Sequence, residues 1–397
     1  MTDLAPGAEA RRLAAGAEDV LPEGRLFEQL SEGRPLRVKL GIDPTAPDIH
    51  LGHCVVLGKL AEFQRAGHTV VLIIGDYTAR VGDPSGRDTQ RPVLSPGEIE
   101  ANARTFQEQA FKLLDRDRTE VRFNSEWLEM PTEDLFRLAR TVTVAQVLER
   151  DDFQNRMRAD RPISTLELLY PLLQGYDSVA IRADLELGGT DQKFNLLLAR
   201  DIQRAYDVPQ QSILTMPILP GLDGRQRMSK SLGNYVGVTD PPEEMFGKLM
   251  SVPDEAMGTY YELLLGRGVP AAEHPAKAKR ALAAAIVQRF HDGAAARVAE
   301  ERFDQVHVSR EVPDDIPEVR LDGAGAAVRV GAGGEVHLPQ LMSAAFELST
   351  SEARRLLAQG GVRLDGEVVA ADALDLPLAA LQGKVLQVGK RRFVRLV

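Results

Sequence analysis

One stretch decides the fold of this chain: Gly41-Ile42-Asp43-Pro44-Thr45-Ala46-Pro47-Asp48-Ile49-His50-Leu51-Gly52-His53. Residues 37–42 predict a strand, and a helix is expected to begin near His50 and to stop at Gly67. The apolar, β-branched run over residues 69–74 then predicts a parallel strand that is buried on both faces. A strand, a helix and a strand of these lengths form a βαβ unit, whose crossover is expected to be right-handed.

A second motif, Met228-Ser229-Lys230-Ser231, follows a Pro/Gly-rich loop much later in the chain. Each motif alone has an ordinary explanation, because His-x-Gly-His occurs by chance and a Ser/Lys-rich loop is usually only solvated. Together, in this order and about as far apart as one nucleotide-binding fold allows, they suit transfer of an adenylyl group from ATP. The sequence therefore predicts an α/β fold with a Rossmann-like, doubly wound parallel sheet.

The rest of the chain indicates four parts. We expect a catalytic domain over residues 1–240, with a helical insertion at about 105–170 and further strands at Val179-Ala180-Ile181 and 213–219. An Ala-rich helical domain is expected over 241–308. The segment 309–337 has Pro and Gly spacing typical of a linker. Residues 338–397 predict a small α+β domain of two helices followed by short strands.

Composition excludes several classes of protein. The chain has 397 residues, 44% of them hydrophobic and 27% charged, as in ordinary globular proteins. No run approaches the ~20 apolar residues of a membrane span, and the N-terminus lacks the pattern of a secretory signal. The single cysteine, Cys54, excludes an internal disulfide and makes a zinc site improbable on spacing. These features predict a cytoplasmic protein without a membrane partner and without a bound metal.

The net charge of −10 does not suggest a general nucleic-acid binder. Residues 338–397, however, carry eight Lys+Arg against six Asp+Glu, and the segment 389–395 is densely basic around Phe393. That segment fits a solvated strand end and an RNA-facing edge equally well.

The histidines and the lysine of the two motifs suit phosphate chemistry. Two histidines three residues apart at a helix N-terminus lie on one face and add to the positive end of the helix dipole. Lys230, on a Ser/Gly-containing loop, is placed to meet the charge that grows as pyrophosphate departs. The ordinary alternative for His50 and His53 is a pair of hydrogen-bonded core imidazoles.

From about residue 25 to its end, the chain resembles the class I aminoacyl-tRNA synthetases, and within them the bacterial tyrosyl-tRNA synthetases. The motifs that carry this resemblance occur in the family's order: Asp43-Pro44-Thr45 with His-Leu-Gly-His, Gly82-Asp83-Pro84-Ser85-Gly86, Tyr170-x-x-x-Gln174-x-x-Asp177, Gly188-Gly189-Thr190-Asp191-Gln192 and Met-Ser-Lys-Ser. The resemblance implies activation of L-tyrosine with Mg·ATP, without a tightly bound cofactor, and its transfer to the 3′-terminal adenosine of tRNA(Tyr). It also implies a homodimer formed through the insertion at about 105–170, and an anticodon-side position for the helical domain 241–308.

Site roles follow from the same resemblance. Catalytic residues around the phosphates would be Thr45, His50, His53, Arg87, Arg91, Arg227 and Lys230. ATP would be bound by Gly41, Asp43, His50, His53, Gly189, Asp191, Met228, Ser229 and Lys230. Tyrosine would be bound by Lys39, Thr78, Asp83, Tyr170, Gln174, Asp177 and Gln192. Of these, Asp177 would select tyrosine by accepting a hydrogen bond from the phenol.

Two positions depart from the family pattern. Lys39 stands where many tyrosyl enzymes carry a second tyrosine that contacts the phenol. It is expected either to neutralise Asp177 or to point elsewhere. Arg227 replaces the first lysine of the usual Lys-Met-Ser-Lys-Ser, which keeps the charge but exchanges an ammonium for a planar fork. We expect activity to survive this second exchange.

The C-terminal part resembles the S-four-type RNA-binding domain. The residues that would contact phosphates there are Arg354, Arg355, Arg363, Lys390, Arg391 and Arg392. A plain helix–hairpin unit with surface arginines fits this segment about as well when it is taken alone. For the whole chain, the alternatives are a tryptophanyl-tRNA synthetase and an inactive RNA-binding paralogue.

Overall fold

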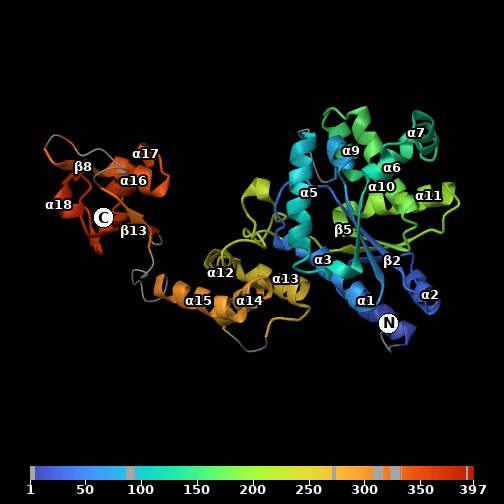
Figure 1. The fold of residues 1–397 in the computed structure, drawn as a ribbon, viewed down its shortest axis with the longest axis horizontal. Coiled ribbons are helices and arrows are strands. Elements are labelled where there is room, and N and C mark those ends of the chain that lie inside the picture. Colours follow the sequence, from blue (N-terminus) through green and yellow to red (C-terminus); the bar gives the residue numbers. More distant parts are fainter. Residues whose placement is uncertain are drawn as a thin grey trace. The chain divides into compact units, whose positions relative to one another are not determined.

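The structure, a computed structural model, describes residues 5–85, 94–270, 274–306, 316–321, 331, 333–389 and 392–397. The chain divides into two compact units, 1–292 and 293–397 (Figure 1). The finer domain boundaries expected from the sequence stay predictions.

The first unit contains a six-stranded sheet whose centre is parallel (Figure 1). Its strand order is β1 (Asp19–Leu21), β6 (Ser212–Met216), β5 (Leu185–Gly189), β2 (Arg37–Ile42), β3 (Thr69–Ile74) and β4 (Thr119–Phe123). Only β1, among these strands, runs antiparallel to its neighbour. The predicted strands at 37–42 and 69–74 are confirmed, and β3 is buried along nearly its whole length, as its apolar run requires.

Two expectations about strands need correction. Val179 and Ala180 form the last residues of a helix rather than a strand, and the strand of this region is β5. An apolar triplet is too short to distinguish a helix end from a strand, so the pattern was ambiguous. Within the region predicted as helical, β4 completes the sheet next to β3. Its charged, half-buried sequence hides the apolar pattern of a strand.

Helices cover and extend this sheet. They are α1 (Pro6–Ala14), α2 (Arg25–Ser31), α3 (Leu51–Arg65), α4 (Thr78–Val81), α5 (Pro96–Ala110), α6 (Ser125–Leu128), α7 (Thr132–Ala139), α8 (Val144–Val147), α9 (Asp151–Arg158), α10 (Thr165–Ala180), α11 (Lys193–Ala205), α12 (Pro242–Met250), α13 (Asp254–Leu265) and α14 (Pro275–Phe290). The long helix α10 begins at a capping box of Ser164 and Glu167. It packs closely on α11 because Gly175 has no Cβ; one would lie 2.5 Å from Cδ1 of Ile202.

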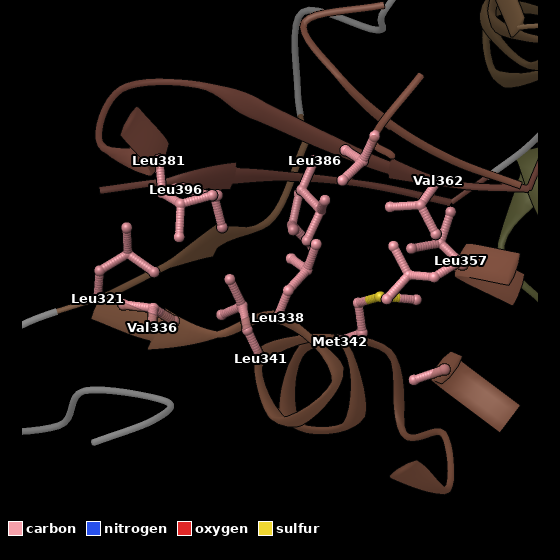
Figure 2. Packing of buried hydrophobic residues seen from close by; sticks show 14 residues of the cluster. Leu321, Val336, Leu338, Leu341, Met342, Leu357, Val362, Leu381, Leu386 and Leu396 are labelled. Atoms are coloured by element: carbon pink, nitrogen blue, oxygen red, sulfur yellow. The ribbon is translucent and has the colours of Figure 1, made fainter. Parts of the chain in front are cut away.

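The second unit has helices α15 (Gly293–Asp304), α16 (Leu338–Phe346), α17 (Thr350–Ala358) and α18 (Leu378–Leu381). Its main sheet has the order β10 (Glu367–Val368), β9 (Val362–Leu364), β12 (Val385–Val388), β13 (Arg392–Leu396) and β7 (Glu318–Val319). A small sheet pairs β8 (Glu335–His337) with β11 (Asp375–Pro377). In Figure 2, Leu338, Leu341 and Met342 of α16 lie among leucines and valines of the strands, so this unit has its own apolar core.

The short strands expected in residues 338–397 include a hairpin, β9–β10. Asp365 and Gly366 form its turn, with φ of 48° and 85°. Two consecutive positive φ values are typical of the tight hairpin turns that favour Asp-Gly.

Candidate active site

A cavity of about 520 Å³ opens at the carboxyl ends of β2 and β5. The chain leaves β2 for β3 on one side, whereas β5 pairs on the other, so this is the point where the strand order reverses. In open α/β sheets, ligands bind at such a point. The residues predicted for the site that line this cavity are Gly41, Asp43, Thr45, His50, His53, Thr78, Asp83, Tyr170, Gln174, Asp177, Gly189, Asp191, Gln192, Arg227, Met228, Ser229 and Lys230.

His50 and His53 hold the N-terminus of α3. His50 is the N-cap, and its Nδ1 accepts from the backbone N–H of Gly52 at 3.2 Å. The Nδ1 of His53 accepts from the backbone N–H of His50 at 3.2 Å. A Cβ on Gly52 would lie 2.9 Å from the His50 ring, so a glycine is needed between the two histidines. The histidine motif therefore acts locally as a helix cap.

Both imidazoles are neutral at physiological pH. Burial, together with the nearby His53 and Lys230, lowers the pKa of His50 to about 2. Burial and Lys230 lower the pKa of His53 to about 4. Because each Nδ1 accepts a backbone hydrogen bond, the ring proton lies on Nε2. The histidines can thus offer two neutral N–H donors to a phosphate, and the expected positive charge comes from the helix terminus and Lys230.

The segment that follows the Met228–Ser231 loop is tied to the histidine motif by backbone hydrogen bonds. The N–H of Leu51 donates to the carbonyl of Val236 at 3.0 Å, and the N–H of Val238 donates to Ile49 at 3.0 Å. The ammonium of Lys230 forms an ion pair with Asp48, whose side chain is 40% exposed. The two distant motifs therefore border the same cavity, with the lysine held by a carboxylate that solvent can replace.

Asp43 stands at the end of β2 among hydroxyl groups. Its Oδ1 accepts from Oγ1 of Thr78 at 2.7 Å, and its Oδ2 accepts from the hydroxyl of Tyr170 at 3.0 Å. A Cβ on Gly75 would lie 2.1 Å from Oδ1 of Asp43, so this close arrangement requires a glycine. At Gly41 a Cβ would meet nothing within 4 Å, which leaves open backbone at the cavity wall.

Asp177 is a buried carboxyl on the cavity-facing side of α10. It follows Tyr170 and Gln174 by seven and three residues, which places all three on one helix face. Its Oδ1 accepts from Nε1 of Trp127 at 2.8 Å, and its Oδ2 accepts from Nδ2 of Asn124 at 3.5 Å. Burial raises the pKa of Asp177 to about 7, although the charge of Lys39 and these hydrogen bonds oppose the rise.

Lys39 lies beneath the cavity and does not line it. Its side chain is fully buried, and its Nζ lies 2.9 Å from Oε1 of Glu186, which does line the cavity. The sequence left open whether Lys39 neutralises Asp177 or points elsewhere. Its direct partner is Glu186, and it acts on Asp177 through its charge.

A family model described as tRNA synthetases class I (W and Y) matches residues 31–308. The chain belongs to this family. It is 50% identical to the tyrosine–tRNA ligase of Moorella thermoacetica, over 98% of this chain and 95% of the relative. It is 49% identical to that of Thiobacillus denitrificans, over 97% of this chain and 98% of the relative.

Solved synthetases share the fold. The tyrosyl-tRNA synthetase of Archaeoglobus fulgidus, solved in complex with L-tyrosine, matches with a TM-score of 0.60 and 25% identity over 74% of this chain and 99% of its own. A C-terminally truncated mitochondrial tyrosyl-tRNA synthetase of Aspergillus nidulans matches with a TM-score of 0.61 at 21% identity, over 76% of this chain and 94% of its own. Class I synthetases of this kind use ATP, which suits a cavity bordered by both motifs.

One polar network of the synthetase site was missed from the sequence. Asn195, on α11, is almost fully buried, and its Nδ2 donates to Gln174 at 2.8 Å and to Gln192 at 3.1 Å. Arg150, from the insertion, donates to Oδ1 of Asn195 at 2.7 Å and to Oγ of Ser85 at 2.9 Å. No motif marks Arg150, because its place depends on how the insertion packs.

Asp83 closes this network at the cavity wall. Its Oδ2 accepts from Nε2 of Gln192 at 2.9 Å, and its Oδ1 accepts from the backbone N–H of Ser85. Asn124 and Trp127 were also not predicted, because they follow β4, a strand that was missed from the sequence. Arg87 and Arg91 lie outside the described residues.

The arginines predicted to bind RNA do not all lie together. Arg354 and Arg355 are exposed on α17. Arg363 alternates with the core residues of β9, so it lies on the sheet face away from the core. Arg392 pairs with Val388, a core residue, and its guanidinium lies 5.9 Å from the ring centre of Phe346. Lys390 and Arg391 lie outside the described residues.

The described residues contain no group of three or more His, Cys, Asp or Glu side chains placed to hold a metal ion. Within the same residues, no helix is long and apolar enough to cross a bilayer.

Proposed function

We propose that this synthetase is a tyrosine–tRNA ligase. The observation that carries the proposal is a cavity lined both by the two nucleotide motifs, which form what we call its phosphate end, and by the buried carboxyl of Asp177, which marks what we call its amino-acid end. The Asp177 carboxyl, held by Trp127 and Asn124, can accept a hydrogen bond from the phenol of tyrosine. When phenylalanine binds, the buried carboxyl lacks this partner, which disfavours phenylalanine. The relatives support tyrosine, and they do not favour a tryptophanyl enzyme or an inactive paralogue.

In the first step, the tyrosine carboxylate attacks the α-phosphate of ATP, forming tyrosyl-adenylate and releasing pyrophosphate. Mg²⁺ enters with ATP as part of the substrate. His50 and His53 donate neutral hydrogen bonds to the phosphates, and Lys230 leaves Asp48 to meet the departing pyrophosphate. Catalysis is positioning and electrostatic stabilisation, with no residue of the chain covalently modified.

The other predicted ligands divide by their position. Asp83, Tyr170 and Gln174 line the cavity and are proposed to bind the tyrosine ammonium, and Gln192, which also lines it, is proposed to lie near the carboxylate. Gly189 and Asp191 are proposed to bind the ribose, and Arg227 lies 3.6 Å from the Asp191 carboxylate.

In the second step, a hydroxyl of the 3′-terminal ribose of tRNA(Tyr) takes the tyrosyl group and AMP is released. Residues 338–397 are proposed to bind the tRNA as an S-four-type domain. Its exposed Arg354 and Arg355 support this role, because phosphate contacts position RNA without reading its sequence.

The working enzyme is proposed to be a cytoplasmic homodimer. Large apolar side chains lie exposed on four successive helices of the insertion region: Phe136 on α7, Val144 on α8, Met157 on α9 and Leu166 on α10. Such side chains are typical of a surface that a second copy covers. The single, buried Cys54 suits a reducing compartment.

ATP–[³²P]pyrophosphate exchange with separate tyrosine, tryptophan and phenylalanine tests the proposal, followed by charging of tRNA(Tyr). We expect exchange with tyrosine and esterification of the tRNA. Exchange driven by tryptophan would overturn the specificity, and no exchange with any of the three would overturn the enzymatic proposal.

A further inference from the structure

Beneath the amino-acid end of the cavity lies a buried ion pair that the proposed reaction does not use. Lys39 of β2 and Glu186 of β5 are register partners across the two strands, and their side chains are 0% and 1% exposed. The ammonium also donates to Oγ of Ser178 at 2.8 Å and to the carbonyl of Gln174 at 3.1 Å. All three N–H groups of the lysine are therefore used within the protein.

The hydrogen bonds of this pair reach the cavity-facing side of α10. Ser178 and the carbonyl of Gln174 belong to α10, so Lys39 ties that helix to β2. Glu186 accepts from Gln211 at 2.5 Å and from Ser178 at 3.0 Å. The pair thus fixes the turn of helix that carries Asp177.

Two carboxyl groups share this region with one lysine. Asp177 accepts from Trp127 and Asn124, which are neutral, so the charges that act on it come from Lys39 on β2 and Glu186 on β5. Burial is the largest cause of the raised pKa of Asp177; Lys39 opposes it and Glu186 adds to it. The ionisation of Asp177 near neutral pH therefore depends on both partners.

Stability alone is a weak reason for such a pair. A buried ion pair can often be replaced by apolar side chains of similar volume without loss of stability, whereas removal of one partner leaves a costly unpaired charge. Its position against the helix that carries Asp177 gives the pair a role in the site.

We infer that Lys39 and Glu186 are positioning residues that set the ionised fraction of Asp177 and so determine selectivity for a phenol over a phenyl ring. An ionised carboxylate accepts the phenol O–H as a charge-assisted hydrogen bond, which is stronger than a neutral one. This inference rests on the proposed tyrosine activation.

The test is the pH dependence of kcat/KM for tyrosine and for phenylalanine in pyrophosphate exchange, between pH 5.5 and 9. For the wild type, tyrosine kcat/KM should fall as Asp177 is protonated, with an acid limb near pH 7. Lys39→Met should move this limb up by about one pH unit, and Glu186→Gln should move it down. At pH 7 the Lys39→Met shift corresponds to a roughly fivefold loss of kcat/KM for tyrosine, because the ionised fraction of Asp177 falls from about one half to about one eleventh. For phenylalanine, which has no phenol, kcat/KM should not fall with this acid limb.

Controls separate this role from a structural one. Lys59→Met removes another buried lysine, paired with Glu62 at 2.6 Å, and should leave the limb in place. If Lys39→Met fails to fold, Lys39→Met/Glu186→Met removes both charges. Because Lys39 acts more strongly than Glu186 on Asp177, this double variant should still move the limb up, by less.

Limbs that stay in place in both single variants, or that move in the same direction, would overturn the inference. An equal loss for tyrosine and phenylalanine would do the same, because it indicates a folding defect. A wild type without tyrosine-dependent exchange would contradict the proposed function instead.

Discussion

The two ends of the cavity are built in opposite ways. At the phosphate end, the titratable rings of His50 and His53 are neutral, and the cation Lys230 sits on a loop beside a partly exposed carboxylate. At the amino-acid end, full charges are buried: Lys39 and Glu186 pair out of contact with solvent. The first end therefore has a cation that can move, and the second has charges that cannot.

This difference fits the two tasks of an adenylate-forming site. Charge on the phosphates grows during the reaction, so a group that arrives late stabilises the transition state more than the ground state. The amino acid must be distinguished before any chemistry, so its partners need to be fixed in advance. We therefore expect substitutions at the first end to change kcat, and those at the second to change kcat/KM among amino acids.

The largest effect is expected for Lys230→Met. Loss of a cation that meets the leaving pyrophosphate should lower the rate of adenylate formation by about 10²–10³-fold, with the KM for tyrosine little changed. Single-turnover formation of tyrosyl-adenylate measures this rate. Arg225→Met, on the same loop but outside the cavity lining, is the matched control and should be nearly silent. A raised KM for tyrosine with an unchanged rate of adenylate formation would mean that Lys230 acts on the amino acid and not on the phosphates.

Asp177→Asn should reduce selectivity for tyrosine over phenylalanine by roughly 10–100-fold, the range of a hydrogen bond to a charged group. The amide oxygen still accepts from Trp127, so the fold should survive. The ratio of kcat/KM for the two amino acids measures the effect. An unchanged ratio would remove Asp177 from specificity.

Arg150→Lys should raise the KM for tyrosine by about 3–10-fold with kcat nearly constant. The planar fork of Arg150 bonds Ser85 and Asn195 together, and a lysine does not reproduce that geometry. Steady-state exchange with varied tyrosine measures this split. Arg158→Lys, an exposed neighbour on α9, is the control. A fall of kcat with an unchanged KM for tyrosine would mean that Arg150 only supports the fold.

The smallest effect is expected for Asp48→Asn. Lys230 would no longer have to leave an ion partner, and partly exposed pairs contribute about 0–1 kcal/mol. The kcat for adenylate formation should therefore rise by about two- to fivefold at low salt, and less at high salt. A raised KM for ATP would mean that Asp48 assists binding instead.

The sequence predicted best what neighbouring residues build together. The strands at 37–42 and 69–74, the helix start at His50 and the common face of Tyr170, Gln174 and Asp177 each depend on a short period or a local cap. The family resemblance added the candidate roles, and most of those residues line the cavity.

It could not predict what folding brings together from segments without a motif. Asn124 and Trp127 follow β4, an edge strand whose charges conceal its pattern, and yet they hold Asp177. Arg150 contacts the site from the insertion, and Lys39 contacts Glu186 because β2 pairs with β5. The residues of the phosphate end could thus be predicted from the sequence, whereas most residues that position the amino-acid end could not.

One measurement tests the contrast between the two ends most directly: the pH profiles of kcat and of kcat/KM for tyrosine in wild-type pyrophosphate exchange. We predict that kcat stays flat from pH 5.5 to 8, because the pKa values of His50 and His53 lie at about 2 and about 4. We predict that kcat/KM falls below about pH 7 as Asp177 takes up a proton. A kcat that falls with a midpoint near the ordinary histidine pKa, beside a flat kcat/KM, would contradict the account.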